Sequence, residues 1–446
     1  MLATEKPATY NSVAAQHDLP SRLLHARRRS DALFSIVRPE SLYDRPIPER
    51  HRIIFYLGHL EAFDWNLLHD RALSLKTFHP EFDRLFAFGI DPVGGGLPSD
   101  KPSDWPNVAT VREYVRAVRG SLDDGLANAP NEAASSGRCS LTTLLNVAIE
   151  HRLMHLETLA YMLHQLPLDC KIGQADASLP FTEPATPEMI EIPAGTATLG
   201  LSRASDKFGW DNEYESHAIH VPAFAIDRYK VTNRRYLEFI EAGGYETHSF
   251  WSDDWNWKVT QGISHPVFWR RNGGQWLYRG MFDEVPLPPD SPVYVSHAEA
   301  AAYARWAEKS LPSEAEWHRA ALGEPGGSEG DYPWGSHPPG AEFGNFDFER
   351  WDPTPVNAFP KGRSAFGVND IVGNGWEWTS TVLAPFAGFV PFPFYRGYSA
   401  DFFDGKHFVM KGGSARTAAC MLRRSFRNWF QAHYQYVYAG FRCVSR

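Results

Sequence analysis

The sequence SLTTLLNVAIEHRLMHLETLAYMLHQL, residues 140–166, decides the fold of the first part of the chain. Apolar residues recur in it every three or four positions, which is the spacing of an amphipathic helix. Ser140 is a good N-cap, and Pro167 ends the helical pattern. The stretch therefore predicts one long helix. His151 and His155 lie four residues apart in it, so their side chains share one face of the helix, roughly 6 Å apart.

Helical spacing also appears upstream of this stretch. We predict helices over residues 23–37, 51–75 and 110–126. Thr110 is a candidate N-cap for the last of them. The intervening segment 79–108 is rich in Pro, Gly and Asp, which indicates a loop that crosses the bundle. Together these stretches predict a four-helix bundle in the first part of the chain.

The character of the sequence changes beyond residue 170. Residues 171–188 are mostly polar and contain three prolines, which is typical of a linker. After them, short β-rich pieces alternate with turns that contain Gly, Pro and Trp, and helical spacing recurs over residues 233–243 and 296–310. We therefore predict a helical bundle over residues 1–170, the linker, and an α+β domain over residues 189–446.

A third histidine, His59, lies in the middle of the predicted helix over residues 51–75. Because bundles build metal sites from inward-facing side chains of neighbouring helices, His59 can join His151 and His155 in a three-histidine site with open positions. Such a site suits zinc or non-haem iron. Arg152 stands where the HExxH motif has its general base, so a zincin protease is excluded. A histidine pair on a helix also occurs as a surface feature, and spacing alone leaves that alternative open.

Motifs in the second half resemble the formylglycine-generating-enzyme-like domain. They follow the order of that domain at residues 298–320 (AEAAAYARWAEKSLPSEAEWHRA), 332–335 (YPWG), 367–378 (GVNDIVGNGWEW), 411–414 (KGGS), 427–429 (RNW) and 439–442 (AGFR). The resemblance implies a variant of the C-type lectin fold with little regular secondary structure. A formylglycine-generating enzyme proper binds copper through cysteines. The four cysteines of this chain form no such pair, which argues against that activity.

The first half resembles a DinB-like bundle with an HxxxHxE motif, here His151, His155 and Glu157. This bundle followed by a formylglycine-generating-enzyme-like domain is similar to the ergothioneine- and ovothiol-type sulfoxide synthases. The resemblance implies a mononuclear non-haem Fe(2+) site at His59, His151 and His155, with Glu157 beside the ligands rather than among them. It also implies a reaction with O2 that joins a sulfur donor to C2 of the imidazole of hercynine, which is N-trimethylhistidine.

The same resemblance implies roles for residues of the second half. Tyr395 supplies a proton or hydrogen atom during the reaction, and Tyr398 contacts the substrate. Asn428 and Trp429 line the hercynine pocket, where an aromatic face attracts the trimethylammonium group. The alternative for the two tyrosines is ordinary packing within the aromatic-rich segment FVPFPFYRGY, residues 389–398.

The chain departs from this family at positions that hold the donor. Synthases that use γ-glutamylcysteine follow RNW with an aspartate and, four positions later, an arginine, whereas this chain has Phe430 and Tyr434. The loop between the ligand helices, residues 89–97, lacks their arginines, and Met154 replaces a glutamine before the third ligand. A zwitterionic donor needs charged partners, so these losses argue against γ-glutamylcysteine. Phe430, Tyr434 and Met154 are therefore the candidate donor-binding residues.

Aromatic rings in place of charges suit a neutral, ring-shaped donor, because sugars stack their C–H faces on such rings. In this respect the chain looks like the selenoneine synthase branch, which joins hercynine to a selenosugar. The alternative is an ergothioneine-type synthase that takes cysteine or another thiol. Arg112, Arg116 or Arg396 would then bind the carboxylate of the donor. A third alternative is a binding module without metal or catalysis.

The composition excludes several classes of protein. The chain has 446 residues and a formal net charge of −9, which argues against a nucleic-acid-binding protein. It contains no run of about 18 apolar residues, and its first residues lack the apolar core of a signal peptide, so we predict no membrane span. The four cysteines form no CxxC motif. We therefore expect a cytoplasmic protein. The resemblance implies that its partners are small molecules: hercynine, the donor and O2.

Overall fold

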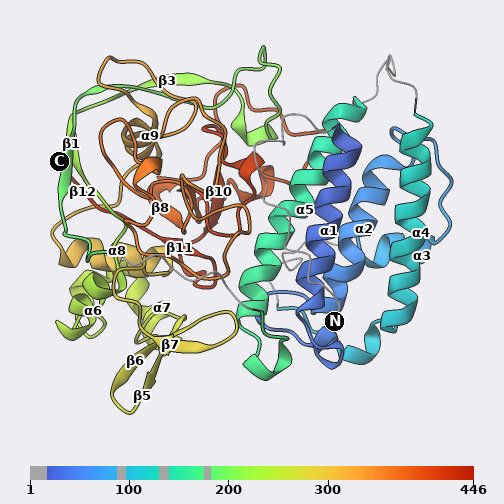
Figure 1. The fold of residues 1–446 in the computed structure, drawn as a ribbon, viewed down its shortest axis with the longest axis horizontal. Helices are drawn as coiled ribbons and strands as arrows, with labels where there is room; N and C mark the ends of the chain where they lie inside the picture. The colour runs from blue at the N-terminus through green and yellow to red at the C-terminus, as the bar shows by residue number, and fades with distance from the viewer. Residues whose placement is uncertain (1–17, 88–96, 130–139, 175–181) are drawn as a thin grey trace.

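The computed structural model describes residues 18–87, 97–129, 140–174 and 182–446, and its two parts lie side by side (Figure 1). Helices from the first third of the chain form one part. Strands, short helices and long connections from the rest of the chain form the other. Helix α5 (Leu141–His164) lies at the boundary between them. The predicted fold class, a helical bundle followed by an α+β domain, is confirmed.

The described part of the bundle has four long helices and one short helix. They are α1 (Leu19–Ser35), α2 (Ile53–Leu68), α3 (Pro80–Leu85), α4 (Val108–Ala127) and α5. Helices α1 and α2 both pack against α5, and α2 also packs against α4. Nearly every residue of α5 is buried, because the bundle covers one side of the helix and the second domain covers the other. Polar side chains on such a helix need partners inside the protein.

Helix α2 is shorter than the predicted helix over residues 51–75. It ends at Leu68, where the backbone N–H of Leu73 bonds to the Leu68 carbonyl and closes a turn. Leu73 and Leu75 still pack on the bundle, beside Gly125 of α4. The prediction was too long because apolar spacing does not distinguish core residues on a turn from core residues on a helix.

The other helix boundaries follow their capping residues. Ser140 caps α5 as predicted, since its side chain accepts a hydrogen bond from the N–H of Thr143 at 3.1 Å. Helix α4 begins earlier than predicted, because Asn107 rather than Thr110 is its N-cap, and the Asn107 side chain accepts from the N–H of Thr110. The segment predicted as a crossing loop contains helix α3.

The second domain is built from small sheets and short helices. Its helices are α6 (Asn233–Glu241), α7 (Trp255–Thr260), α8 (His297–Trp306) and α9 (Glu314–Leu322). Its strands are β1 (Met189–Ile192), β2 (Gly195–Leu199), β3 (His217–Val221), β4 (Phe224–Asp227), β5 (Trp269–Asn272), β6 (Gln275–Arg279), β7 (Glu284–Pro286), β8 (Trp376–Val382), β9 (His407–Lys411), β10 (Asn428–Gln431), β11 (Ala439–Gly440) and β12 (Val444–Ser445). Helices α6 and α8 confirm the two predicted helices, each a few residues shorter.

Four sheets organise this domain. The largest has the strand order β10-β9-β8-β11, and the others are β1-β4-β12, β5-β6-β7 and the pair β2-β3. Strand β10 pairs antiparallel with β9, so that Asn428 and Trp429 lie opposite Met410 and Val409. Strand β8 begins at Trp376, which reaches α5. The central sheet therefore presents two of the family motifs to the boundary with the bundle.

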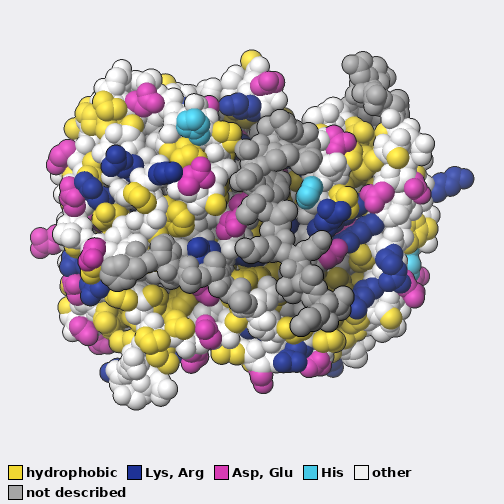
Figure 2. All heavy atoms as spheres, in the orientation of Figure 1, with side chains coloured by type: hydrophobic (Ala, Val, Ile, Leu, Met, Phe, Trp, Pro, Cys, Tyr) yellow, Lys and Arg dark blue, Asp and Glu magenta, His cyan; other side chains and the backbone are white. Residues whose placement is uncertain are grey.

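No helix in the described ranges combines the length and the apolarity that crossing a membrane requires. Acidic and basic side chains are interspersed over the face of the molecule that Figure 2 shows. This mixture agrees with the near balance of 44 Lys and Arg against 53 Asp and Glu in the sequence.

Candidate metal centre

Three histidines meet where α2 packs against α5. His59 of α2 and both His151 and His155 of α5 are buried. Nε2 of His155 lies 3.3 Å from Nε2 of His59 and 3.1 Å from Nε2 of His151. One nitrogen from each of the three side chains lies within 4.8 Å of the other two. The structure thus brings together the three residues that the sequence analysis put forward as metal ligands; we call them the histidine cluster.

The geometry and protonation of the histidine cluster fit one metal ion. Two imidazole nitrogens that bind one ion at about 2.0–2.1 Å are about 2.9 Å apart at a right angle and about 3.4 Å apart at a tetrahedral angle. The observed 3.1 and 3.3 Å fall in that range. Burial lowers the pKa of His59 to about 4 and the pKa values of His151 and His155 well below 6.5. All three rings are therefore neutral at pH 7, which is the form that binds a metal.

The three imidazoles are oriented in different ways. Nδ1 of His59 bonds to the carbonyl of Phe86 at 2.7 Å, so Nδ1 carries the proton and Nε2 keeps its lone pair for a metal. Nδ1 of His151 and Nδ1 of His155 are buried, and neither has a hydrogen-bond partner among the described residues. The ring of His151 stacks instead on Phe63 of α2, with centroids 3.4 Å apart and planes 10° apart.

Glu157 ties the helix of the histidine cluster to the second domain. Its carboxylate accepts hydrogen bonds from Trp376 Nε1 at 2.7 Å and from Thr417 Oγ1 at 2.9 Å, and it also accepts one from Ser414. Burial raises the pKa of Glu157, and these three hydrogen bonds oppose that rise. All three donors belong to the second domain. Glu157 therefore fixes the position of α5 against that domain, two residues beyond His155.

Arg152, between the two histidines of α5, belongs to a separate group of charges inside the bundle. Its fully buried guanidinium lies 2.9 Å from Glu61 and 2.6 Å from Asp64, both on α2. Burial acts to raise the pKa of Glu61, but the charges of Arg152, Arg119 and Arg27 lower it to about 2. We call these five residues the arginine cluster. Two carboxylates of this cluster face three guanidiniums, and Arg27 and Arg119 also pair with Asp123 and Asp31.

The second domain covers the histidine cluster with aromatic side chains. The ring centroid of Tyr395 lies 6.1 Å from that of His151 and 5.3 Å from that of Phe63. The hydroxyl of Tyr398 donates a hydrogen bond to Sδ of Met154, on α5, at 3.5 Å. The structure therefore places Tyr395, Tyr398 and Met154 beside the cluster. Sequence analysis missed Phe63, although its spacing of four residues from His59 puts both on one face of α2.

The RNW motif lies behind Tyr398. The ring of Trp429 is edge-on to that of Tyr398, with centroids 5.5 Å apart, and Tyr398 also stacks on Trp210 at 3.9 Å. The side chain of Asn428 accepts a hydrogen bond from the N–H of Trp429 at 2.9 Å. Trp429 therefore contacts Tyr398, which lies between Trp429 and the histidine cluster. The hydrogen bond of Asn428 is local, at the start of β10.

Phe430 and Tyr434 form a stacked pair, with centroids 5.0 Å and planes 13° apart. Both rings are edge-on to Tyr161 of α5, at 6.4 and 6.1 Å. Arg50, which the sequence analysis missed, is buried beside them. Its Nε donates to the Tyr434 hydroxyl at 2.9 Å, and its Nη2 donates to the Tyr161 hydroxyl at 3.2 Å. Arg50 precedes α2 and belongs to no motif, so nothing in the local sequence identifies it.

The three arginines put forward as partners for a donor carboxylate do not have the expected surroundings. Arg112 and Arg116 are exposed on α4, and Arg396 is exposed in its loop. Exposed guanidiniums remain hydrated, and the role of these three arginines stays a prediction. The loop over residues 89–97 is interpreted as the loop that lacks the arginines of the donor site. Residues 89–96 of it lie outside the described residues.

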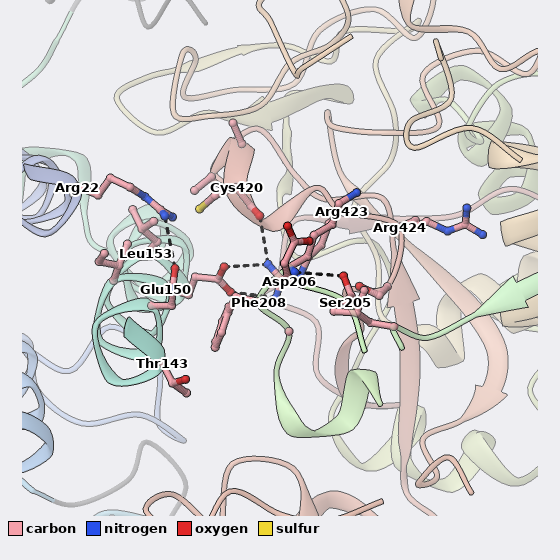
Figure 3. A pocket seen from close by; sticks show the side chains of 18 of the residues that line it. Arg22, Thr143, Glu150, Leu153, Ser205, Asp206, Phe208, Cys420, Arg423 and Arg424 are labelled. Atoms are coloured by element: carbon pink, nitrogen blue, oxygen red, sulfur yellow. Dashed lines mark hydrogen bonds and ion pairs between the residues drawn. The ribbon is translucent and has the colours of Figure 1, made fainter. Parts of the chain in front are cut away.

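A large cavity lies beside α5, between the two domains. Its volume is about 980 Å³, and Arg22, Glu150, Leu153 and Arg423 are among its lining residues (Figure 3). Arg423 pairs with Glu150 at 2.8 Å and donates to the Cys420 carbonyl at 3.1 Å. None of the three histidines is among the described residues that line this cavity. The cavity is therefore distinct from the histidine cluster.

Protein-family comparison agrees with this architecture. Residues 22–159 match the DinB superfamily, and residues 175–446 match the Sulfatase-modifying factor enzyme 1-like domain. The fold and the histidine cluster together define a two-domain protein in which a DinB-type bundle is covered by a domain of the sulfatase-modifying-factor type.

Similar proteins identify the family within this class. The "Hercynine oxygenase" of Mycolicibacterium thermoresistibile is 35% identical over 445 residues, covering 96% of this chain and 95% of its own. The "Hercynine oxygenase" of Mycolicibacterium smegmatis is 35% identical over 440 residues, covering 96% and 98%. "Ergothioneine biosynthesis protein 1" of Neurospora crassa is 29% identical, covering 91% of this chain and 55% of its own. The chain belongs to the ergothioneine-type sulfoxide synthase family.

Proposed function

We propose that this chain is an Fe(2+)-dependent oxygenase that joins C2 of the hercynine imidazole to a selenosugar through a C–Se bond. Its similarity to hercynine oxygenases over nearly the whole chain supports hercynine as one substrate. The observation that carries the choice of donor is the stacked pair of Phe430 and Tyr434. These rings stand where synthases that use γ-glutamylcysteine have opposite charges, and a sugar ring can stack on them.

In this proposal the residues of the site have separate tasks. Fe(2+) held by the histidine cluster supplies the activation of O2. Tyr395 holds a proton on its phenolic oxygen beside the cluster and delivers it during the reaction. Tyr398 and Trp429 offer aromatic faces to the trimethylammonium group of hercynine. Asn428, next to Trp429, contributes a side-chain amide to the same pocket.

The proposed reaction balances with one molecule of O2. The C2–H bond of hercynine and the Se–H bond of the donor are broken, and one C–Se bond forms. O2 accepts four electrons, so that one oxygen atom leaves as water and the other remains on selenium. Met154, whose thioether lies on α5 beside the cluster, is a soft neighbour suited to a sulfur or selenium atom.

A second candidate is a sulfoxide synthase that joins hercynine to cysteine, γ-glutamylcysteine or another thiol. One observation favours it. The relatives of this chain include "Ergothioneine biosynthesis protein 1" of Neurospora crassa, which is 29% identical. The two candidates differ in the donor and share the histidine cluster, hercynine and O2.

A donor competition separates the two candidates. The protein is loaded with Fe(2+) without oxygen and given hercynine, and then a selenosugar, γ-glutamylcysteine or cysteine in separate reactions. O2 is admitted, and the products are identified by mass spectrometry. We expect a coupled product with the selenosugar and little with either thiol. A coupled product with a thiol and none with the selenosugar would overturn the selenosugar proposal and support the second candidate.

A paired variant provides the matched control. Phe430→Asp together with Tyr434→Arg restores the charges found in synthases that use γ-glutamylcysteine. We expect this variant to lose the selenosugar product and to gain activity with γ-glutamylcysteine, while its KM for hercynine stays within about threefold of the wild-type value. Unchanged donor preference would show that these two positions do not select the donor.

A further inference from the structure

Helix α2 carries one phenylalanine four residues before its histidine and another four residues after it. Phe55, His59 and Phe63 follow one another at intervals of four residues and share one face of the helix. Phe55 stacks on His59 of the same helix, with centroids 4.8 Å and planes 21° apart. Phe63 leans away from His59, at 6.3 Å and 54°, and stacks on His151 of α5. The two phenylalanines therefore stack on different histidines of the cluster.

The stacking on Phe63 takes the place of a missing hydrogen bond. An imidazole turns readily about its last side-chain torsion, so a metal-binding histidine needs a second contact to aim its nitrogen. His59 has that contact in the Phe86 carbonyl, at 2.7 Å from its Nδ1. Nδ1 of His151 has no hydrogen-bond partner among the described residues. The face of Phe63, with its centroid 3.4 Å from that of His151, fixes the plane of this ring instead.

Phe63 also links the metal centre to the second domain. Its ring packs edge-on against Tyr395, with centroids 5.3 Å apart and planes at 61°. Tyr395 lies farther from His151 itself, at 6.1 Å. One phenyl ring is thus in contact with a histidine of the bundle and with a tyrosine of the other domain.

We infer that Phe63 is a positioning residue: it aims the His151 imidazole at the shared metal position and sets where Tyr395 stands beside it. The part that concerns Tyr395 rests on the proposed function. The part that concerns His151 requires only that the histidine cluster binds a divalent metal. Phe55 is the natural control, because it stacks on a histidine that a hydrogen bond already orients.

The test compares Phe63→Leu with Phe55→Leu. Leucine keeps much of the apolar volume but lacks a flat face. Apo protein is titrated with Co(2+), and the visible absorption of the bound ion reports both its affinity and its coordination geometry. We expect Phe63→Leu to weaken Co(2+) binding about 10-fold or more and to change the spectrum. We expect Phe55→Leu to stay within about threefold of wild type with the same spectrum. Phe63→Tyr, which keeps the ring, restores both properties.

A second readout addresses Tyr395. With Fe(2+), hercynine and the active donor, Phe63→Leu should form severalfold less coupled product per O2 consumed, and Phe55→Leu should match wild type. Circular dichroism establishes that each variant is folded, and Phe63→Met replaces Phe63→Leu if the latter does not fold. Equal effects of the two leucine variants on Co(2+) binding would refute the positioning role. Failure of wild type to bind Co(2+) would instead refute the metal centre itself.

Discussion

Two buried polar clusters lie side by side between α2 and α5, and they solve the problem of burial in opposite ways. The arginine cluster pairs guanidiniums with carboxylates, with Arg152 2.9 Å from Glu61 and 2.6 Å from Asp64. The histidine cluster contains three nitrogen donors and no carboxylate, and burial lowers the pKa values of all three. His151 and Arg152 are neighbours in the sequence, yet they belong to different clusters.

This difference distinguishes a cluster that stabilises the bundle from a cluster that binds a ligand, although both lie between α2 and α5. Removal of one partner from a buried ion-pair group is measured as lost stability. Three neutral imidazoles with nitrogens 3.1 and 3.3 Å apart are incomplete without a cation to share their lone pairs. We therefore assign the arginine cluster to the stability of the bundle and propose the histidine cluster as the site of metal binding.

The largest effect is expected from removal of one member of the histidine cluster. His155→Ala should lose stoichiometric Fe(2+) binding and reduce product formation more than about 100-fold, because loss of a ligand exceeds the usual effect of a residue that only supports one. Iron content after anaerobic loading and product yield are the measurements. His164→Gln, on the same helix but outside the cluster, should keep its iron. Full iron content in His155→Ala would show that the histidine cluster is not the site of iron binding.

The next largest effect concerns the arginine cluster. Arg152→Met leaves Glu61 and Asp64 buried without their central partner, and it should lower the free energy of unfolding by about 3–5 kcal/mol. The folded variant should still bind one Fe(2+) per chain. Denaturant unfolding followed by circular dichroism and iron analysis test both statements. Loss of iron from a folded Arg152→Met protein would show that the two clusters are one functional unit.

Addition of metal should distinguish the clusters by a gain in the free energy of unfolding instead of a loss. Fe(2+) at 100 times its Kd should stabilise the wild-type protein by about 2.7 kcal/mol, since it binds the folded state alone. Arg152→Met should gain the same increment from its lower starting point, and His155→Ala should gain almost none. Anaerobic unfolding curves with and without Fe(2+) measure these increments. An equal gain in His155→Ala would place the stabilising metal elsewhere.

A third buried group on α5 gives an effect that is confined to acidic pH. Burial lowers the pKa of His164 to about 3, although its ring contacts the Tyr438 hydroxyl at 3.1 Å and the Arg279 carbonyl at 2.6 Å. The unfolded chain takes up a proton near pH 6.5 and the folded chain does not, so His164 makes the protein less stable as the pH falls from 6.5 towards 3.

The contribution of His164 is at most about 1.4 kcal/mol per pH unit in that window. In metal-free protein, His164→Gln should have a shallower loss of unfolding free energy between pH 6.5 and 4 than wild type. Denaturant unfolding at a series of pH values measures this slope. An unchanged slope would show that His164 is protonated equally in the folded and unfolded states.

Sequence reasoning was most successful where the relevant signal is local. Periodicity and the Ser140 cap located α5, and the spacing of four residues placed His151 and His155 on one face of it. The order of motifs in the second half identified its domain type. Bringing His59 into the same cluster depends on how α2 packs against α5, which spacing suggests but does not determine.

The residues that the sequence analysis missed act across long separations in the chain. Arg50 reaches Tyr434, which lies 384 positions later, and no motif surrounds it. Phe63 contacts His151 and Tyr395, which come from a different helix and a different domain. The strands of the second domain are two to seven residues long, too short for periodicity to define their pairing. Tertiary packing decides all of these contacts.

Anomalous diffraction at the iron absorption edge tests the central claim most directly. Crystals of the protein grown with Fe(2+) in the absence of oxygen should contain one strong anomalous peak, roughly 2.1 Å from a nitrogen of each of His59, His151 and His155. No peak should lie at the arginine cluster. A histidine cluster without the peak in iron-loaded, active protein, or a peak held by other residues, would contradict the account.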